Sequence, residues 1–144
     1  MAGIDALGTQ FLRETAVADT FEVIANVTDI SGPSRSREAI DVTAHDSPDK
    51  YREFIKGLKD GGEVELTLNY DPSATTHKAL DTDFEEDDLH TYQVILLPGE
   101  AEEHTWEFSS LITGLGEEYP TEGQMERTAT FKISGKPTLT PTGV

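Results

Sequence analysis

The sequence predicts a mainly β protein, an antiparallel β-sandwich or small barrel with one flanking α-helix. Three observations support this fold class: several short segments alternate apolar and polar residues, one segment has helical spacing, and turn residues separate the segments. The 144 residues are enough for a single domain that buries a substantial core, and we expect one domain over residues 1–144.

The first strands are predicted from a period of two along the chain. Residues 21–29 place Phe21, Val23, Ala25 and Val27 on one face, and a second extended segment covers residues 38–44 after a turn-rich stretch. Residues 63–70 alternate most strictly. Their predicted inward side chains are Val64, Leu66, Leu68 and Tyr70, and their predicted outward side chains are Glu63, Glu65, Thr67 and Asn69.

One helix is predicted over residues 72–86. Pro72 and Ser73 suit a helix start, and His77, Leu80 and Phe84 recur at helical spacing. An acidic run at residues 81–88 ends this helix. Three further strands follow, and their predicted core residues are Tyr92, Val94, Leu96, Trp106, Phe108, Ile112, Ala129, Phe131 and Ile133.

Both chain ends have a composition that is typical of segments without regular secondary structure. We expect residues 1–19 and 136–144 to be terminal arms, which are either frayed tails or segments that dock on the exposed strand edge of a neighbour.

The composition narrows the function classes. The chain has 28 acidic and 11 basic residues, a net charge of −17, which disfavours nucleic-acid binding through a basic patch. This acidity fits solubility, a salt-adapted host whose proteins are broadly acidic, or a surface past which a polyanion moves without binding. Without cysteine there is no disulfide framework and no thiolate metal site. The sequence shows no signal-peptide pattern and no apolar run long enough to insert in a membrane.

No residues are predicted to be catalytic, to bind a cofactor or to ligate a metal. His45, His77, His90 and His104 lack recognisable ligand spacing, and the HDSPD and DFEEDDLH segments read as a turn and a solvated helix end. A hydrolase would need converging carboxylates in a cleft, which no motif here indicates.

The segment IDVTAHDSPDKYREFIKGLKDGGEVELTLNYDP (residues 40–72) resembles the signature region of major tail tube proteins of long, flexible-tailed phages. NVTDISGPSRSREAIDVT, LPG, TWEFSSLITGL and ATFKISGKPTL extend the resemblance in order from about residue 20 to 139. The resemblance implies the same β fold without an added immunoglobulin-like domain, assembled as six-fold rings that stack head-to-tail into a hollow tube. It implies no cofactor and no catalytic residues.

The resemblance also implies where the protein is located and which proteins it binds. We expect a virion tail protein, made in the cytoplasm of a bacterial or archaeal host, whose partners are itself and the tail-tip, tape-measure and tail-terminator proteins. Phage DNA would pass through the tube without sequence-specific binding. Two alternatives stay open: a secretion-system tube protein with the same ring, and a monomeric acidic β-sandwich that binds a ligand or partner.

Within this framework residues 44–62 are predicted to form a long inter-subunit stacking loop. Its expected contact residues are Pro48, Tyr51, Arg52, Phe54, Ile55, Lys56, Leu58 and Lys59. The alternative is that the apolar members cap their own sandwich. Gly61 and Gly62 would supply a sharp backbone turn. Glu63, Glu65, Thr67 and Asn69 are the predicted lumen lining, since a basic lining would hold DNA.

Overall fold

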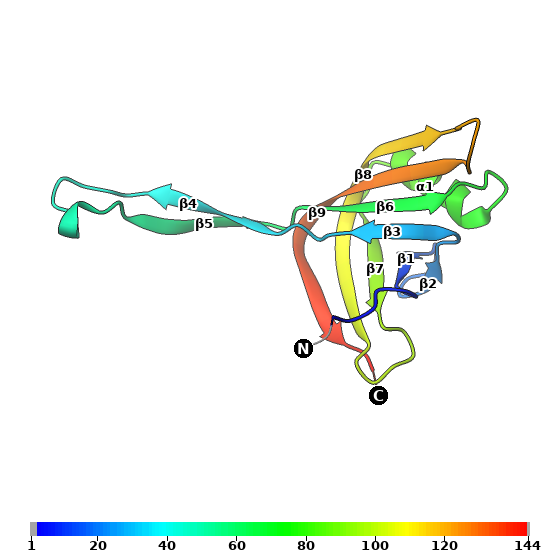
Figure 1. Ribbon diagram of the computed structural model, residues 1–144, viewed down its shortest axis with the longest axis horizontal. Helices are drawn as coiled ribbons and strands as arrows, with labels where there is room; N and C mark the ends of the chain where they lie inside the picture. The colour runs from blue at the N-terminus through cyan, green and yellow to red at the C-terminus, as the bar shows by residue number, and fades with distance from the viewer. Residues whose placement is uncertain (1–2, 144) are drawn as a thin grey trace.

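The computed structural model describes residues 3–143, which form a seven-stranded antiparallel sheet, a two-stranded ribbon and one α-helix (Figure 1). The large sheet has the order β2-β1-β7-β8-β9-β6-β3. Its strands are β1 (Gln10–Glu14), β2 (Phe21–Val23), β3 (Val27–Ser31), β6 (Glu63–Asn69), β7 (His90–Leu96), β8 (His104–Glu118) and β9 (Glu126–Pro141). The predicted fold class, mainly antiparallel β with one flanking helix, is confirmed.

The two longest strands bend the sheet. β7 pairs with the first part of β8, from His104 to Ser110, whereas β6 pairs with the first part of β9. Register shifts between β8 and β9, beside Ser109 and Gly114, mark irregularities that curve the strands. The edge strands β2 and β3 do not pair with each other, so the sheet stays open.

The apolar core lies on the inner face of this bend. Its buried members are Phe11, Ile24, Val64, Leu66, Leu68, Leu80, Tyr92, Val94, Phe108, Ile112, Ala129, Phe131 and Ile133. The alternation predicted for β6, β7, β8 and β9 therefore places the expected side chains inside, with Tyr70, Leu96 and Trp106 packed partly buried against them. Aromatic rings form the centre, where Phe11 lies 5.0 Å from Phe131 between ring centroids.

Helix α1 (Thr75–Glu85) lies within the predicted range 72–86. It begins after a turn in which Asp71 Oδ1 accepts hydrogen bonds from the Ser73 backbone N–H (2.9 Å) and hydroxyl (2.6 Å). Its buried face consists of His77, Leu80 and Asp83. Phe84, which helical spacing grouped with the first two, is 42% exposed, so that part of the prediction is wrong.

The strand predicted over residues 21–29 is wrong in one important respect, because the structure divides it. A turn with Asn26 at φ +62° separates β2 from β3. β2 pairs with β1 at one edge of the sheet and β3 pairs with β6 at the other. The fully buried residue of this stretch is Ile24, and Val23 and Ala25 are exposed, so the predicted inward face is wrong at these positions, whereas Val27 packs half-buried against the core.

The predicted terminal arms are also too long. Residues 10–14 form β1, which pairs with β7 and buries Phe11 in the core. At the other end β9 continues to Pro141, which pairs with His104. Burial of Phe11 and the backbone pairing of β9 account for this order. Of the predicted arms, residues 3–9, 15–19 and 142–143 remain outside these strands, and residues 1–2 and 144 lie outside the described residues.

The segment predicted as a stacking loop is mostly a β-ribbon. β4 (Ser36–Asp41) and β5 (Phe54–Asp60) pair in antiparallel register, with Ile40 opposite Ile55, and a short 3-10 turn η1 (Pro48–Lys50) lies at the tip. Figure 1 shows this ribbon pointing away from the body. We call residues 35–60 the arm. The expected loop 44–62 therefore contains all of strand β5.

Candidate assembly surfaces

The arm carries apolar side chains that its own chain leaves in solvent. Tyr51 is 76% exposed and Leu58 88% exposed, and Ile40, Val42, Phe54 and Ile55 are exposed as well. Cross-strand pairing places Ile40 and Ile55 on one face and Phe54, opposite Asp41, on the other, while a register shift between Lys56 and Lys59 interrupts the alternation of β5 before Leu58. Both faces of the ribbon are therefore partly apolar. Because an isolated two-stranded hairpin is marginally stable, this arrangement favours a partner that packs against it.

The tip of the arm is held by local hydrogen bonds. Ser47 Oγ accepts the Ala44 backbone N–H at 2.9 Å and donates to Glu53 Oε2 at 3.1 Å. Asp49 and Lys50 have positive φ, which tightens the turn after Pro48. Of the expected contact residues, Arg52 lies 4.0 Å from Asp41 across the ribbon, an exposed and weak ion pair. The structure thus places all eight predicted contact residues on the arm, between Pro48 and Lys59.

The arm joins the body at Gly61 and Gly62. Gly62 has φ +77°, and a Cβ atom there would collide with the carbonyl group of Ser34. A Cβ at Gly61 would lie 2.6 Å from Ile133 Cγ2. Only glycine fits both positions without displacement of the backbone or the core. The chain therefore passes from the arm into β6 through a junction that other residues would distort.

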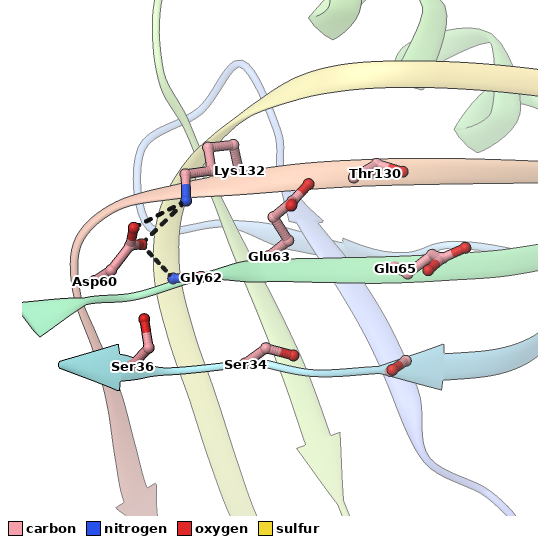
Figure 2. Close-up of a pocket in the computed structure, with 9 residues that line it drawn as sticks. Ser34, Ser36, Asp60, Gly62, Glu63, Glu65, Thr130 and Lys132 are labelled. Atoms are coloured by element: carbon pink, nitrogen blue, oxygen red, sulfur yellow. Dashed lines mark hydrogen bonds and ion pairs between the residues drawn. The ribbon is translucent and has the colours of Figure 1, made fainter. Parts of the chain in front are cut away.

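Beside this junction lies a polar hollow that includes two of the predicted lumen residues. Figure 2 shows Glu63 and Glu65 of β6 beside Thr130 and Lys132 of β9, with Ser34, Ser36 and Asp60 at the arm base. Lys132 Nζ donates to Asp60 Oδ1 at 3.0 Å, and the Gly62 N–H donates to the same oxygen at 2.8 Å. The Gly62 N–H and then Lys132 lower the pKa of Asp60 below its ordinary value.

The other two predicted lumen residues lie further along β6. Thr67 and Asn69 are half-buried, and the Asn69 backbone N–H donates to the Asn26 carbonyl. Glu63 and Glu65 are exposed by contrast. The outward face of β6 is therefore acidic and solvent-accessible near the arm and more enclosed toward α1.

Sequence reasoning missed a buried ionic network that ties α1 to the sheet. Arg127 is buried, and its guanidinium donates to Glu117 Oε1 (2.8 Å), Asp81 Oδ1 (3.0 Å) and the His77 carbonyl (2.9 Å). It also lies 4.3 Å from the ring centroid of Tyr70. The signal was present in the sequence, because Arg127 has the same parity as the buried Ala129, Phe131 and Ile133.

A second network holds the other end of α1. Arg13 donates to both carboxylate oxygens of Asp83, at 2.7 and 3.0 Å, and to Glu22 at 2.8 Å. Burial and then the Asp83 carboxylate raise the pKa of Tyr92, so its hydroxyl stays protonated and donates to Asp83 at 2.9 Å.

Within residues 3–143, one group of side chains has the spacing of a metal site, namely Asp83, Glu86 and His90, whose donor atoms lie within 4.8 Å of one another. Arg13 and Tyr92 already satisfy both oxygens of Asp83, and His90 lies 3.4 Å from Glu86. These partners make the group an ion-pair network that fixes the helix end, and they leave little capacity for a cation.

The described helix of this chain is too short and too polar to cross a membrane. The bent β body and its protruding apolar arm together define a structural assembly subunit. The chain belongs to the lambda phage tail tube protein family, whose model matches residues 5–140. The resemblance drawn from residues 40–72 is thereby confirmed, and the chain is a tail tube protein by family.

Several solved structures share the fold of this chain. The tail of an empty gene transfer agent particle with C6 symmetry matches with a TM-score of 0.77 and 18% identity, over 96% of this chain and 99% of that one. The anti-feeding prophage baseplate matches at 0.75 and 9% identity, over 100% and 99%. The SPP1 tail tube matches at 0.71 and 10% identity, over 94% and 78%. A search of curated protein sequences finds no match.

Proposed function

We propose that this chain is the structural subunit of a phage tail tube, in which six copies close a ring and rings stack head-to-tail through the arm. The observation that carries the proposal is the arm itself, a protruding ribbon with exposed apolar side chains on both faces. A tube grows without limit only if one surface of a subunit contacts a different surface of the next, and the arm is such a surface. The C6 symmetry of one structural neighbour supports the six-fold ring.

The proposal assigns each surface a role. The eight arm residues from Pro48 to Lys59 contact a neighbouring subunit, and the Gly61-Gly62 junction sets the direction of the arm. Glu63 and Glu65, with the more enclosed Thr67 and Asn69, face the lumen and repel DNA, so the genome passes without binding. The tube joins tail-tip, tape-measure and terminator proteins in the virion and is made in the host cytoplasm.

Electron microscopy of the purified protein at rising concentration, with its solution mass, tests this proposal. Wild-type protein should form rings or hollow tubes. Phe54→Ser with Leu58→Ser should abolish them while leaving the urea unfolding midpoint of the monomer unchanged, because both side chains are exposed. Val17→Ser with Tyr119→Ser, two exposed apolar residues outside the arm, is the matched control and should still assemble.

A wild-type protein that stays monomeric at every concentration and also fails to extend purified tail tips of a matching phage would contradict the proposal. That outcome would favour the monomeric binding module. A second candidate is the tube of a contractile injection system, because a sheath-tube complex of that class matches with a TM-score of 0.73 at 13% identity. Tubes that recruit a sheath protein would favour this candidate over a flexible tail.

A further inference from the structure

A hollow at the base of the arm gathers basic residues on an otherwise acidic protein. Arg35, Arg37, Lys59 and Lys136 line it, four of the 11 basic residues in a chain of net charge −17. Its volume is about 710 Å³. We call it the basic hollow. Asp60 also lines it, but that carboxylate is already bound to Lys132 and to the Gly62 N–H.

The four cations of the basic hollow form no ion pair within the part of the chain that the structure describes. Two of them are nevertheless oriented. Arg37 Nε donates to the Gly57 carbonyl at 3.2 Å, and Arg35 lies 5.1 Å from the ring centroid of Trp106. Their remaining guanidinium donors are free to bind carboxylates. The basic hollow is therefore an oriented cationic surface without an anionic partner in its own chain.

The C-terminal end of α1 has the opposite charge, because it carries carboxylates and lacks basic residues of its own. Glu85, Asp87 and Asp88 are exposed at the negative end of the helix dipole, and the last turn contains no basic residue. Carboxylates at this position destabilise a helix, whereas cations there would stabilise it. A local conflict of this kind is typical of a surface used for something other than stability. We call residues 85–88 the acidic helix end.

We propose that the basic hollow of one copy binds the acidic helix end of a second copy of the chain. The proposal rests on the proposed function, in which copies of the chain assemble. The two surfaces are distinct and complementary in charge, so their contact is heterologous and can propagate. Duplex DNA is the less favoured partner, because an acidic body surrounds the four cations and repels a polyanion.

Charge reversal tests the pairing. Lys59→Glu with Lys136→Glu reverses two of the four cations of the hollow, and Asp87→Lys with Asp88→Lys reverses two of the four carboxylates of the helix end; the four-fold variant restores the charge match between the substituted positions and the net charge of −17. Each two-fold variant should raise the concentration needed for assembly by at least about tenfold at low salt, and the four-fold variant should recover most of that loss. Glu100→Lys with Glu102→Lys, which changes the net charge as much as the helix-end variant does but at another place, should change this concentration little.

A zero-length carbodiimide cross-link between ¹⁴N- and ¹⁵N-labelled copies gives a readout that does not require tubes. Links between copies should join Lys59 or Lys136 to residues 85–88. Their absence, or equal assembly of the two-fold and four-fold variants, would overturn the inference. So would duplex DNA binding at about 150 mM salt that reversal of the hollow abolishes.

Different experimental outcomes would contradict the proposed tube function and the proposed pairing of the basic hollow with the acidic helix end. If wild-type tubes survive charge reversal but not Phe54→Ser with Leu58→Ser, the pairing is wrong and the tube function stands. If the wild-type protein neither assembles, extends tail tips nor forms links between copies, both are wrong.

Discussion

Arg127 shows how one polar residue can organise the inside of a β protein. Its side chain is only 2% exposed, whereas its partners Asp81 and Glu117 are 51% and 26% exposed. A buried guanidinium is tolerated only when its donors are satisfied, and here α1, β8 and a backbone carbonyl all contribute acceptors. The network therefore fixes α1 on the sheet in one position.

We expect Arg127→Met to destabilise the fold by about 3 kcal/mol, because it leaves Glu117 and the His77 carbonyl without their donor. Urea unfolding followed by circular dichroism measures this. Lys132→Met is the matched control, since it breaks the exposed pair with Asp60 and should cost less than about 1 kcal/mol. Equal losses in the two variants would contradict the structural role given to the Arg127 network.

Gly62 and Gly135 both have positive φ but differ in their surroundings. A Cβ at Gly62 would collide with the Ser34 carbonyl, while a Cβ at Gly135 would meet nothing within 4 Å. Gly135→Ala should therefore cost about 1 kcal/mol from backbone strain alone, and Gly62→Ala clearly more. Urea unfolding midpoints test the order. A Gly62→Ala variant as stable as Gly135→Ala would show that the arm junction tolerates a side chain.

At the scale of elements, the turn before α1 makes the stability of the fold depend on pH. Hydrogen bonds from the Ser73 hydroxyl and backbone N–H lower the pKa of Asp71 below its ordinary value of 3.8. A carboxyl whose folded pKa is depressed contributes stability that is present above its unfolded pKa and lost as the pH falls through the folded pKa.

Asp71→Ala should thus destabilise the protein at pH 7, and the difference from wild type should shrink as the pH falls from about 5 toward 2. Urea midpoints at several pH values provide the measurement. Ser73→Ala, which removes the hydroxyl donor but keeps the backbone one, should show a smaller version of the same trend. A difference independent of pH would mean that the ionised carboxylate contributes nothing.

The sequence predicted most of the strands with one buried face, although it missed β1, and among the exposed strands it predicted the segment of β4 but not β5. β6, β7 and the core part of β9 alternate strictly because each has a buried and a solvated face. β5 has no buried face, and its sequence therefore predicts a loop with apolar contact residues and not a strand. The division of residues 21–29 depends on the backbone of Asn26, which alternation does not reveal. Arg127 was missed although it is in phase with the core.

For the whole molecule, the charge is divided between two regions. The arm, residues 35–60, has six acidic and six basic residues, so the remaining 22 acidic and five basic residues (28 − 6 and 11 − 6) give the body the full −17. A ring of six copies would have a formal charge of about −102 (6 × −17), screened over roughly 8–10 Å. This division favours an arm that approaches an acidic neighbour without repulsion.

The lumen assignment leads to a prediction about DNA. In assembled tubes, Glu63→Lys with Glu65→Lys should make duplex DNA bind inside, because each lysine that contacts a phosphate releases counterions. Even two such contacts in total would make retention fall about tenfold between 50 and 200 mM salt, and a ring of six variant subunits would show a steeper fall, whereas wild-type tubes should retain little DNA at either concentration. Co-sedimentation of tubes with labelled DNA measures this. Glu118→Lys with Glu122→Lys, which changes the charge equally at the β8–β9 turn, is the control. If the control tubes retain as much DNA as the β6 variant, the outward face of β6 does not line the lumen.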